Sequence, residues 1–244
     1  MKITVNPNLI TYLLGAKPIG VGTTAICFLM PNGNVLKLYH NKYFQKEFSQ
    51  ENYITHFETL NKITNNTYIG PEELLIKENC LGYIYPYVLA KTLHRSVPIL
   101  NSKYIIDKYP KLVEDTKKIS DENFLLNDLH DRNIPIGSII NIIDLDRGEI
   151  NNKLSKEHIC NSNLAKINKT FIYSLFNVKD DELIDFSDDN IQELYSLSIG
   201  REPTIFPELL KYIESKYNST QENLYQLRKR IPYQKRENTY YRYF

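Results

Sequence analysis

The first third of the chain alternates short apolar runs with turn residues, a pattern typical of β-strands. Residues 25–30 are apolar, the turn sequence Pro-Asn-Gly-Asn follows, and residues 35–39 form a second run. Asn-Gly between two such runs is a strong signal for a β-hairpin. Residues 69–76 and 81–88 predict two more strands. The second of these should end at Pro86, because proline cannot donate a hydrogen bond to a sheet.

Helical spacing of apolar residues appears between the two pairs of strands and again in the rest of the chain. Apolar residues from 44 to 63 are spaced close to the period of a helix. The later segments that predict helices are residues 104–119, 162–176, 189–197 and 206–230. The first third is therefore mainly strands with one helix, and the remainder is mainly helical.

The composition agrees with a folded enzyme. The chain has 244 residues, of which 42% are hydrophobic and 12% aromatic, so it can bury a sizeable core. Its net charge of +1 gives no general attraction for nucleic acid or a membrane surface. No apolar run approaches the ~20 residues of a membrane span, and no signal peptide is expected. Three scattered cysteines favour reduced thiols and a cytoplasmic location.

Residues that could carry chemistry gather between positions 127 and 146. Asp128 is followed five residues later by Asn133, and an apolar pair leads into Asp144. Magnesium takes hard oxygen ligands, often one or two carboxylates with phosphates and water. Asn133 and Asp144 could supply such oxygens, and Asp128 could accept the proton of an attacking hydroxyl. Each residue alone would suit an ordinary turn, but the ordered set favours a site.

These segments resemble the catalytic loop and the metal-binding aspartate of the protein-kinase-like superfamily. The resemblance rests on Asp128, His130, Asn133 and the Ile-Ile sequence before Asp144. It is closest to the atypical-kinase and aminoglycoside/choline-kinase branches, and it implies that His130 braces the catalytic loop. Ordinary Ser/Thr kinases carry Lys where His130 stands, and the chain departs from them in two further ways. Leu-Asn stands where His-Arg usually precedes the catalytic aspartate, and Asp146 stands where Asp-Phe-Gly has its glycine.

A glycine-rich loop near the amino terminus supports the same resemblance. Gly20, Gly22 and Ala25 form a Gly-x-Gly-x-x-Ala sequence. An apolar strand follows it rather than the helix of a dinucleotide-binding loop, and the Gly-Lys-Ser/Thr of a P-loop is absent. Glycines in a hairpin, with Lys37 on the return strand, are similar to the kinase loop over the ATP phosphates and the lysine that reaches them. Gly20 and Gly22 would let backbone N–H groups approach these phosphates closely. The alternative is a plain turn.

Lys37 lies in an apolar run, and a buried lysine needs a carboxylate partner. The candidate helix that follows carries Glu47, Glu51 and Glu58. The position within this helix favours Glu51 as the partner, with Glu58 as the second choice. Each of these acids, taken alone, would suit a solvated helix charge.

The resemblance implies an α+β fold, the bilobal protein-kinase-like fold. A small antiparallel β lobe with one helix would span residues 1–88, and a mainly helical lobe would span 89–244. The implied activity is phosphoryl transfer from ATP with Mg²⁺, with ATP between the lobes. Residues 81–88 would form the hinge, where the carbonyl of Pro86 and the N–H of Val88 face adenine. The alternative for this segment is an ordinary aromatic core strand.

The sequence does not decide which class of molecule carries the acceptor hydroxyl. The compact helical part leaves little chain for a metabolite pocket and favours an atypical protein Ser/Thr kinase. The Asp-Leu-His sequence favours a small-molecule kinase of the aminoglycoside/choline type. A pseudokinase or interaction module is a third hypothesis, which the joint presence of Lys37, Asp128, Asn133 and Asp144 opposes. The oligomeric state is not predicted.

Basic and aromatic residues are concentrated in residues 228–244, with Glu237 as the single acid. Such a mixture can bind nucleic-acid strands or acidic surfaces, as in a toxin or phage-type interaction protein. The preferred interpretation is a helix end, where cations are favourable, and a tail whose rings pack on the small lobe or on a partner chain.

Overall fold

The computed structural model describes residues 2–3, 15–40, 50–77, 80–179, 182–217 and 223–237. The chain divides into two compact units. The first comprises the described residues up to Leu89 together with Asp144–Asp146, and the second comprises Ala90–Ile143 and the described residues from Arg147 onward. Among the helices described, none combines the length and the apolar character that crossing a membrane requires.

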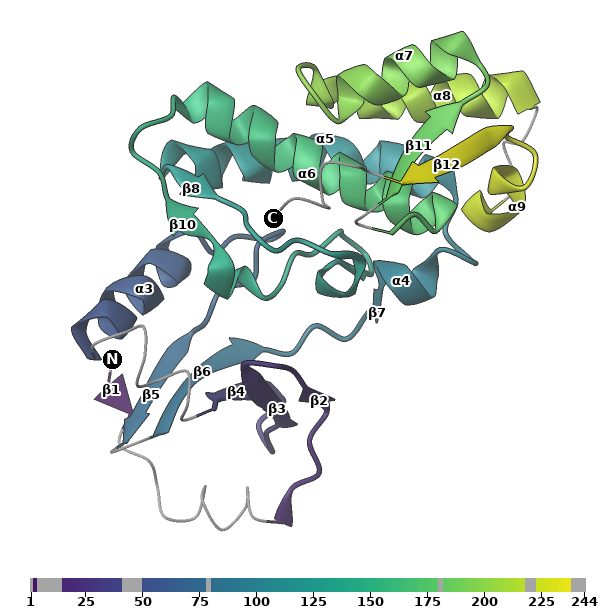
Figure 1. The fold of residues 1–244 in the computed structure, drawn as a ribbon. Helices are drawn as coiled ribbons and strands as arrows, with labels where there is room; N and C mark the ends of the chain where they lie inside the picture. Colours follow the sequence, from purple (N-terminus) through teal and green to yellow (C-terminus); the bar gives the residue numbers. More distant parts are fainter. Residues whose placement is uncertain are drawn as a thin grey trace. The chain divides into compact units, whose positions relative to one another are not determined.

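The first unit is built on a six-stranded sheet (Figure 1) in the order β1-β5-β6-β4-β3-β2. Its strands are β1 (Lys2–Ile3), β2 (Gly20–Val21), β3 (Ala25–Leu29), β4 (Asn34–Tyr39), β5 (Glu73–Lys77) and β6 (Cys80–Pro86). Neighbouring strands are antiparallel, except that β1 and β5 are parallel. The predicted hairpin is present as β3–β4, and β6 ends at Pro86 as expected.

The core of the first unit lies between the sheet and helix α3 (Gln50–Lys62). Leu36, Leu75 and Ile84 from three adjacent strands are buried together. Helix α3 presents one buried face, with apolar residues three or four apart: Tyr53, Phe57 and Leu60. The predicted helix began at residue 44, and residues 41–49 lie outside the described part of the chain.

The second unit is mainly helical. Its helices are α4 (Leu93–Ser96), α5 (Ser102–Asp121), α6 (Lys156–Phe176), α7 (Asp189–Ser198), α8 (Phe206–Tyr217) and α9 (Leu224–Arg228), with short 3₁₀ turns at Asp131–Asn133 and Pro203–Ile205. Its paired strands are β7 (Lys91–Thr92) with β9 (Pro135–Ile136), β8 (Phe124–Leu125) with β10 (Glu149–Ile150), and β11 (Glu182–Phe186) with β12 (Tyr233–Glu237). The helix predicted over 206–230 is therefore two helices, α8 and α9.

Helices α5 and α6 form the centre of this unit. The side chain of Asn101 caps α5 by accepting the Tyr104 N–H at 2.8 Å, and the Ser155 hydroxyl caps α6 in the same way. Rings from α5 and α6, Tyr109 and Phe171, both pack against Phe206 at the start of α8. These contacts hold α5 and α6 together behind the loop that carries Asp128.

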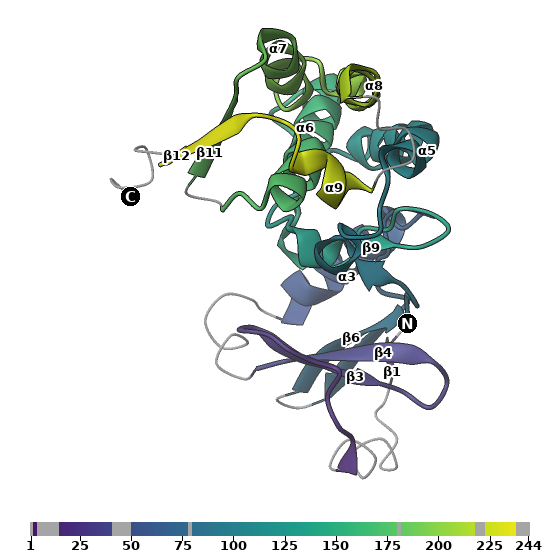
Figure 2. The same ribbon diagram turned by 90° about the vertical axis from the view of Figure 1, so that its right-hand side faces the viewer.

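The basic and aromatic carboxyl-terminal segment forms a strand as far as Glu237. This strand, β12, pairs with β11 (Figure 2), and the Tyr233 ring lies 4.9 Å from that of Phe176. Arg236 pairs with Asp185 of β11 at 2.7 Å. Within this segment the Tyr233 ring therefore packs in the second unit and not on the small lobe, and the other rings of the segment are not among the described residues. Residues 238–244 lie outside the described part of the chain.

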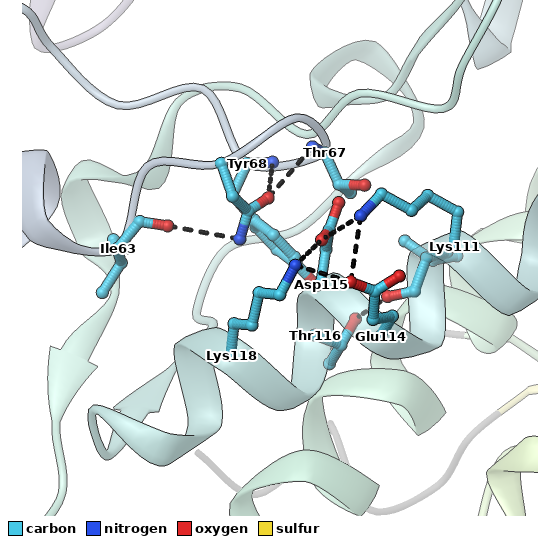
Figure 3. Close-up of polar contacts among 10 residues, drawn as sticks. Ile63, Thr67, Tyr68, Lys111, Glu114, Asp115, Thr116 and Lys118 are labelled. Carbon is cyan, nitrogen blue, oxygen red and sulfur yellow. Dashed lines mark hydrogen bonds and ion pairs between the residues drawn. The ribbon is translucent and has the colours of Figure 1, made fainter.

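A charged cluster lies along α5 (Figure 3). Lys118 pairs with Glu114 at 2.6 Å and with Asp115 at 3.1 Å, and Lys111 pairs with Asp115 at 2.9 Å. All these pairs are three or four residues apart, the spacing at which helical side chains meet. We call these four residues the α5 charge cluster.

Candidate functional site

Lys37 lies in a buried polar cluster of the first unit. Its ammonium group bonds to the carboxylates of Asp144 and Asp146, and the distance to Asp146 is 2.6 Å. The side chains of Lys37 and Asp146 are 11% and 10% exposed, whereas that of Asp144 is 45% exposed. Lys37 and Asp146 are therefore withdrawn from solvent, and Asp144 remains accessible to a ligand.

Asp146 receives two tyrosine hydroxyls in addition to Lys37. Tyr85 of β6 donates to its carboxylate at 2.5 Å, and Tyr39 of β4 donates to the same carboxylate. Lys37 and Tyr39 are two residues apart on one strand, so they lie on the same face of the sheet. We call Lys37, Tyr39, Tyr85, Asp144 and Asp146 the Lys37 cluster. Our sequence interpretation noted Asp146 only as a departure from the family pattern and missed its part in this cluster.

The ionisation of the cluster follows from its surroundings. Burial lowers the pKa of Lys37, but the Asp146 and Asp144 carboxylates outweigh that effect, so the pKa is raised and the side chain is a cation. Burial raises the pKa of Tyr85, so its hydroxyl keeps the proton that it donates. The cluster therefore holds one cation against two carboxylates, and it carries excess negative charge to which a metal ion could bind.

The acids predicted to pair with Lys37 are not the ones that the structure describes beside it. The side chain of Glu51 lies outside the described part of the chain, as does all of Glu47, and Glu58 is exposed on α3. Among the described residues, the carboxylates paired with Lys37 are those of Asp144 and Asp146. The sequence prediction considered only acids of the following helix, whereas these acids lie more than a hundred residues further along the chain.

A glycine permits the close approach of β6 to Lys37. A Cβ atom at Gly82 would lie 2.8 Å from the Lys37 carbonyl oxygen, closer than real Cβ contacts. Any larger residue would therefore push β6 away from β4 where Lys37 is placed. Gly82 thus supports the geometry of the Lys37 cluster without contacting its charged atoms.

The glycine-rich loop is a tight turn between β2 and β3. The Gly22 N–H donates to the Ala25 carbonyl at 2.8 Å, so in this conformation it cannot also donate to a phosphate. Neither Gly20 nor Gly22 has a positive φ, and a Cβ at either would meet its neighbours at ordinary distances. The fold itself therefore does not require glycine at these two positions.

The predicted hinge follows β6. Pro86 ends the strand opposite Asn34, and Val88 lies in the irregular segment beyond it. Within the described residues the Val88 N–H donates to no backbone carbonyl. It is therefore available to an adenine edge, as the hinge interpretation needs.

The loop that carries Asp128 and Asn133 is closed by backbone bonds in the second unit. The Asn133 N–H donates to His130, and its carbonyl accepts the N–H of Ile143, both at 2.9 Å. The Asn133 side-chain nitrogen lies 3.5 Å from the Asp128 carbonyl. Ile143 directly precedes Asp144 in the chain. The bond from its N–H to Asn133 therefore fixes the backbone just before Asp144.

Asp128 and Asp144 share an unusual backbone conformation. Their φ angles are 54° and 61°, in the left-handed region that costs energy for residues other than glycine. Such conformations are found at sites where the surrounding structure holds them for a purpose. Asp128 also pairs with Arg147 at 3.2 Å, and its side chain is 49% exposed.

Residues of helix α6 brace the loop that carries Asp128. Asn163 accepts the Leu126 N–H at 2.8 Å, and Lys166 donates to the Leu126 carbonyl. The side chain of His130 is exposed and makes no hydrogen bond to the described residues. The expectation that His130 braces the loop was therefore wrong, because residues of α6, some forty positions away, have that role.

The donors expected for Mg²⁺ fit that ion in kind. The amide nitrogen of Asn133 is directed to the Asp128 carbonyl, so its oxygen is left to accept a cation. Asp144 adds a half-exposed carboxylate. The described residues contain no group of three or more His, Cys, Asp or Glu side chains suited to a metal. A small number of protein ligands that all bind through oxygen is suited to Mg²⁺ that is bound together with phosphates.

Comparisons with known proteins support the fold. The sequence matches no family model and no curated protein. The structure is similar to the kinase domain of Mycobacterium tuberculosis PknI, with a TM-score of 0.58 over 82% of this chain and 94% of that one, at 11% sequence identity. This chain therefore has the protein-kinase-like α+β fold, as the sequence predicted, with one parallel strand pair added to the small sheet.

Proposed function

We propose that this protein is an ATP- and Mg²⁺-dependent phosphotransferase. The observation that carries the proposal is the Lys37 cluster, in which a buried lysine meets two carboxylates from a segment 107 and 109 residues away. Lys37 would hold the α- and β-phosphates of ATP, and Asp146 would keep its ammonium group in place. The Thr23 and Thr24 backbone at the tip of the glycine-rich loop and the Val88 N–H would bind the rest of the nucleotide.

Asp128 would receive the proton of the acceptor hydroxyl. Its ion pair with Arg147 is exposed on both sides, so an incoming hydroxyl can displace the arginine at little cost. Asn133 and Asp144 would hold Mg²⁺, which neutralises charge on the transferring phosphate when bound. The strained backbone at Asp128 and Asp144 would fix both carboxylates before the substrate arrives.

The finer proposal is an atypical protein Ser/Thr kinase, with a small-molecule kinase of the aminoglycoside/choline type as the alternative. A pseudokinase would keep nucleotide binding without transfer. The separate roles of Asp128 and Lys37 distinguish these cases, because loss of Asp128 should abolish transfer while nucleotide binding persists.

The test is transfer of label from γ-labelled ATP by purified protein with Mg²⁺, beside Asp128→Ala. The incubation contains the protein alone, then a mixed protein acceptor, then an aminoglycoside or choline. Label on protein with wild type only supports a protein kinase, and label on the small hydroxyl compound supports the alternative. Mg²⁺-dependent ATP binding with no label anywhere supports a pseudokinase, and absence of ATP binding overturns the proposal.

A further inference from the structure

A groove of about 780 Å³ opens in the second unit beside Asp128. Its walls come from α4, the catalytic loop, the second half of α6 and α9. Four cations line it, namely Lys166, Lys169, Lys179 and Arg228. They outnumber the two carboxylates in the lining, Asp128 and Asp131. The groove is therefore basic overall where it meets the proposed catalytic base.

These cations are held at separate points along the groove. The Lys169 ammonium group lies 4.9 Å from the centre of the Tyr173 ring, and the Arg228 guanidinium lies 4.7 Å from that of Tyr225. Arg228 also donates to the Leu175 carbonyl at 3.1 Å. A single phosphate is best bound by donors that converge on it, whereas Lys169 and Arg228 are tied to different local partners. The pattern suits several acidic groups spread along an extended chain.

We propose that this groove binds an acceptor peptide whose serine or threonine is flanked by acidic residues. The inference rests on the proposed phosphotransferase function and names its substrate class. The acceptor oxygen would bond to the γ-phosphorus as the bond to the β–γ bridging oxygen breaks. ADP leaves, and the hydroxyl proton passes to Asp128. Tyr173 and Tyr225 would add apolar contact along the peptide.

The experiment measures binding and transfer separately on the full chain. Fluorescein-labelled peptides carry one serine flanked by glutamates, or by glutamines in the matched control, and their binding is followed by anisotropy without ATP. The groove variant is Lys169→Glu/Lys179→Glu. The control variant is Lys153→Glu/Lys156→Glu, which makes the same charge change at exposed positions near the start of α6. Thermal unfolding establishes that both variants are folded.

We expect the glutamate peptide to bind more tightly than the glutamine peptide, and the groove variant to weaken that binding roughly tenfold, the scale of two partly exposed ion pairs. The control variant should bind as wild type does. Equal binding of both peptides, or no binding of either peptide, would overturn the inference. Selective peptide binding without phosphoryl transfer from labelled ATP would support the groove as a site for acidic peptides and would overturn the phosphotransferase proposal.

Discussion

In both the Lys37 cluster and the α5 charge cluster, a lysine pairs with two carboxylates. The two clusters differ in how far apart the paired residues lie in the sequence. On α5 the partners are three or four residues apart. In the Lys37 cluster they are 107 and 109 residues apart. The first arrangement follows from helix geometry alone, whereas the second exists only once the chain has folded.

The two clusters also differ in which group solvent can reach. On α5 the shared carboxylate, Asp115, is fully buried while its lysines Lys111 and Lys118 are 36% and 53% exposed. In the Lys37 cluster the lysine is buried and Asp144 is the accessible group. An accessible carboxylate beside a buried cation can exchange partners with a ligand. A buried carboxylate covered by lysines is instead a structural anchor.

Replacing Asp144 should have the largest effect on activity. We expect Asp144→Asn to lower kcat by about 10³-fold, because it removes the accessible charge proposed to hold Mg²⁺ at the transferring phosphate. The measurement is labelled-phosphate transfer across a range of Mg²⁺ concentrations, with thermal unfolding to check folding. A rate near that of wild type would remove Asp144 from the proposed mechanism.

Replacing Lys37 should lower turnover by about two orders of magnitude, the scale of losing one preorganised charge contact. It should also destabilise the protein, because Asp146 would be left buried without its cation. The double variant Lys37→Met/Asp146→Asn should recover the stability but not the turnover, measured by urea unfolding and phosphate transfer. Recovery of turnover in the double variant would mean that Lys37 acts only as a structural counter-ion.

Local sequence patterns predicted the parts of this site that neighbouring residues determine. The β3–β4 hairpin, the end of β6 at Pro86 and the helices around the catalytic loop follow from turn chemistry and apolar spacing. The pairing of Lys37 with Asp144 and Asp146 did not, because tertiary packing brings these acids from more than a hundred residues away. A weak signal existed in the spacing of Lys37 and Tyr39, because alternate residues of a strand lie on one face.

Asp146 and Asp115 offer a matched pair of substitutions. Asp146→Asn should lower kcat about tenfold, because Lys37 keeps Asp144 but loses the carboxylate that would hold it when a nucleotide binds. Asp115→Asn should lower the free energy of unfolding by about 1–3 kcal/mol, the cost of disturbing a buried charged group, and leave kcat unchanged. For both variants, kcat is measured by phosphate transfer and the free energy of unfolding by urea unfolding. Similar kcat values for the two would remove the functional distinction between the clusters.

The smallest expected effect is a pH dependence at His56, which borders the Lys37 cluster. Burial lowers the pKa of His56 below its ordinary 6.5, although a bond to the Asp146 backbone acts in the opposite direction. The unfolded chain therefore takes up a proton near pH 6.5 that the folded chain resists. This contribution to stability is complete above that pH and declines as the pH falls below it.

We expect the free energy of unfolding to decrease between about pH 7 and pH 5, and to decrease less steeply in His56→Gln. His158→Gln, at an exposed position on α6, should keep the wild-type slope. Urea unfolding at several pH values measures both. An unchanged slope in His56→Gln would mean that folding does not shift the pKa of this ring.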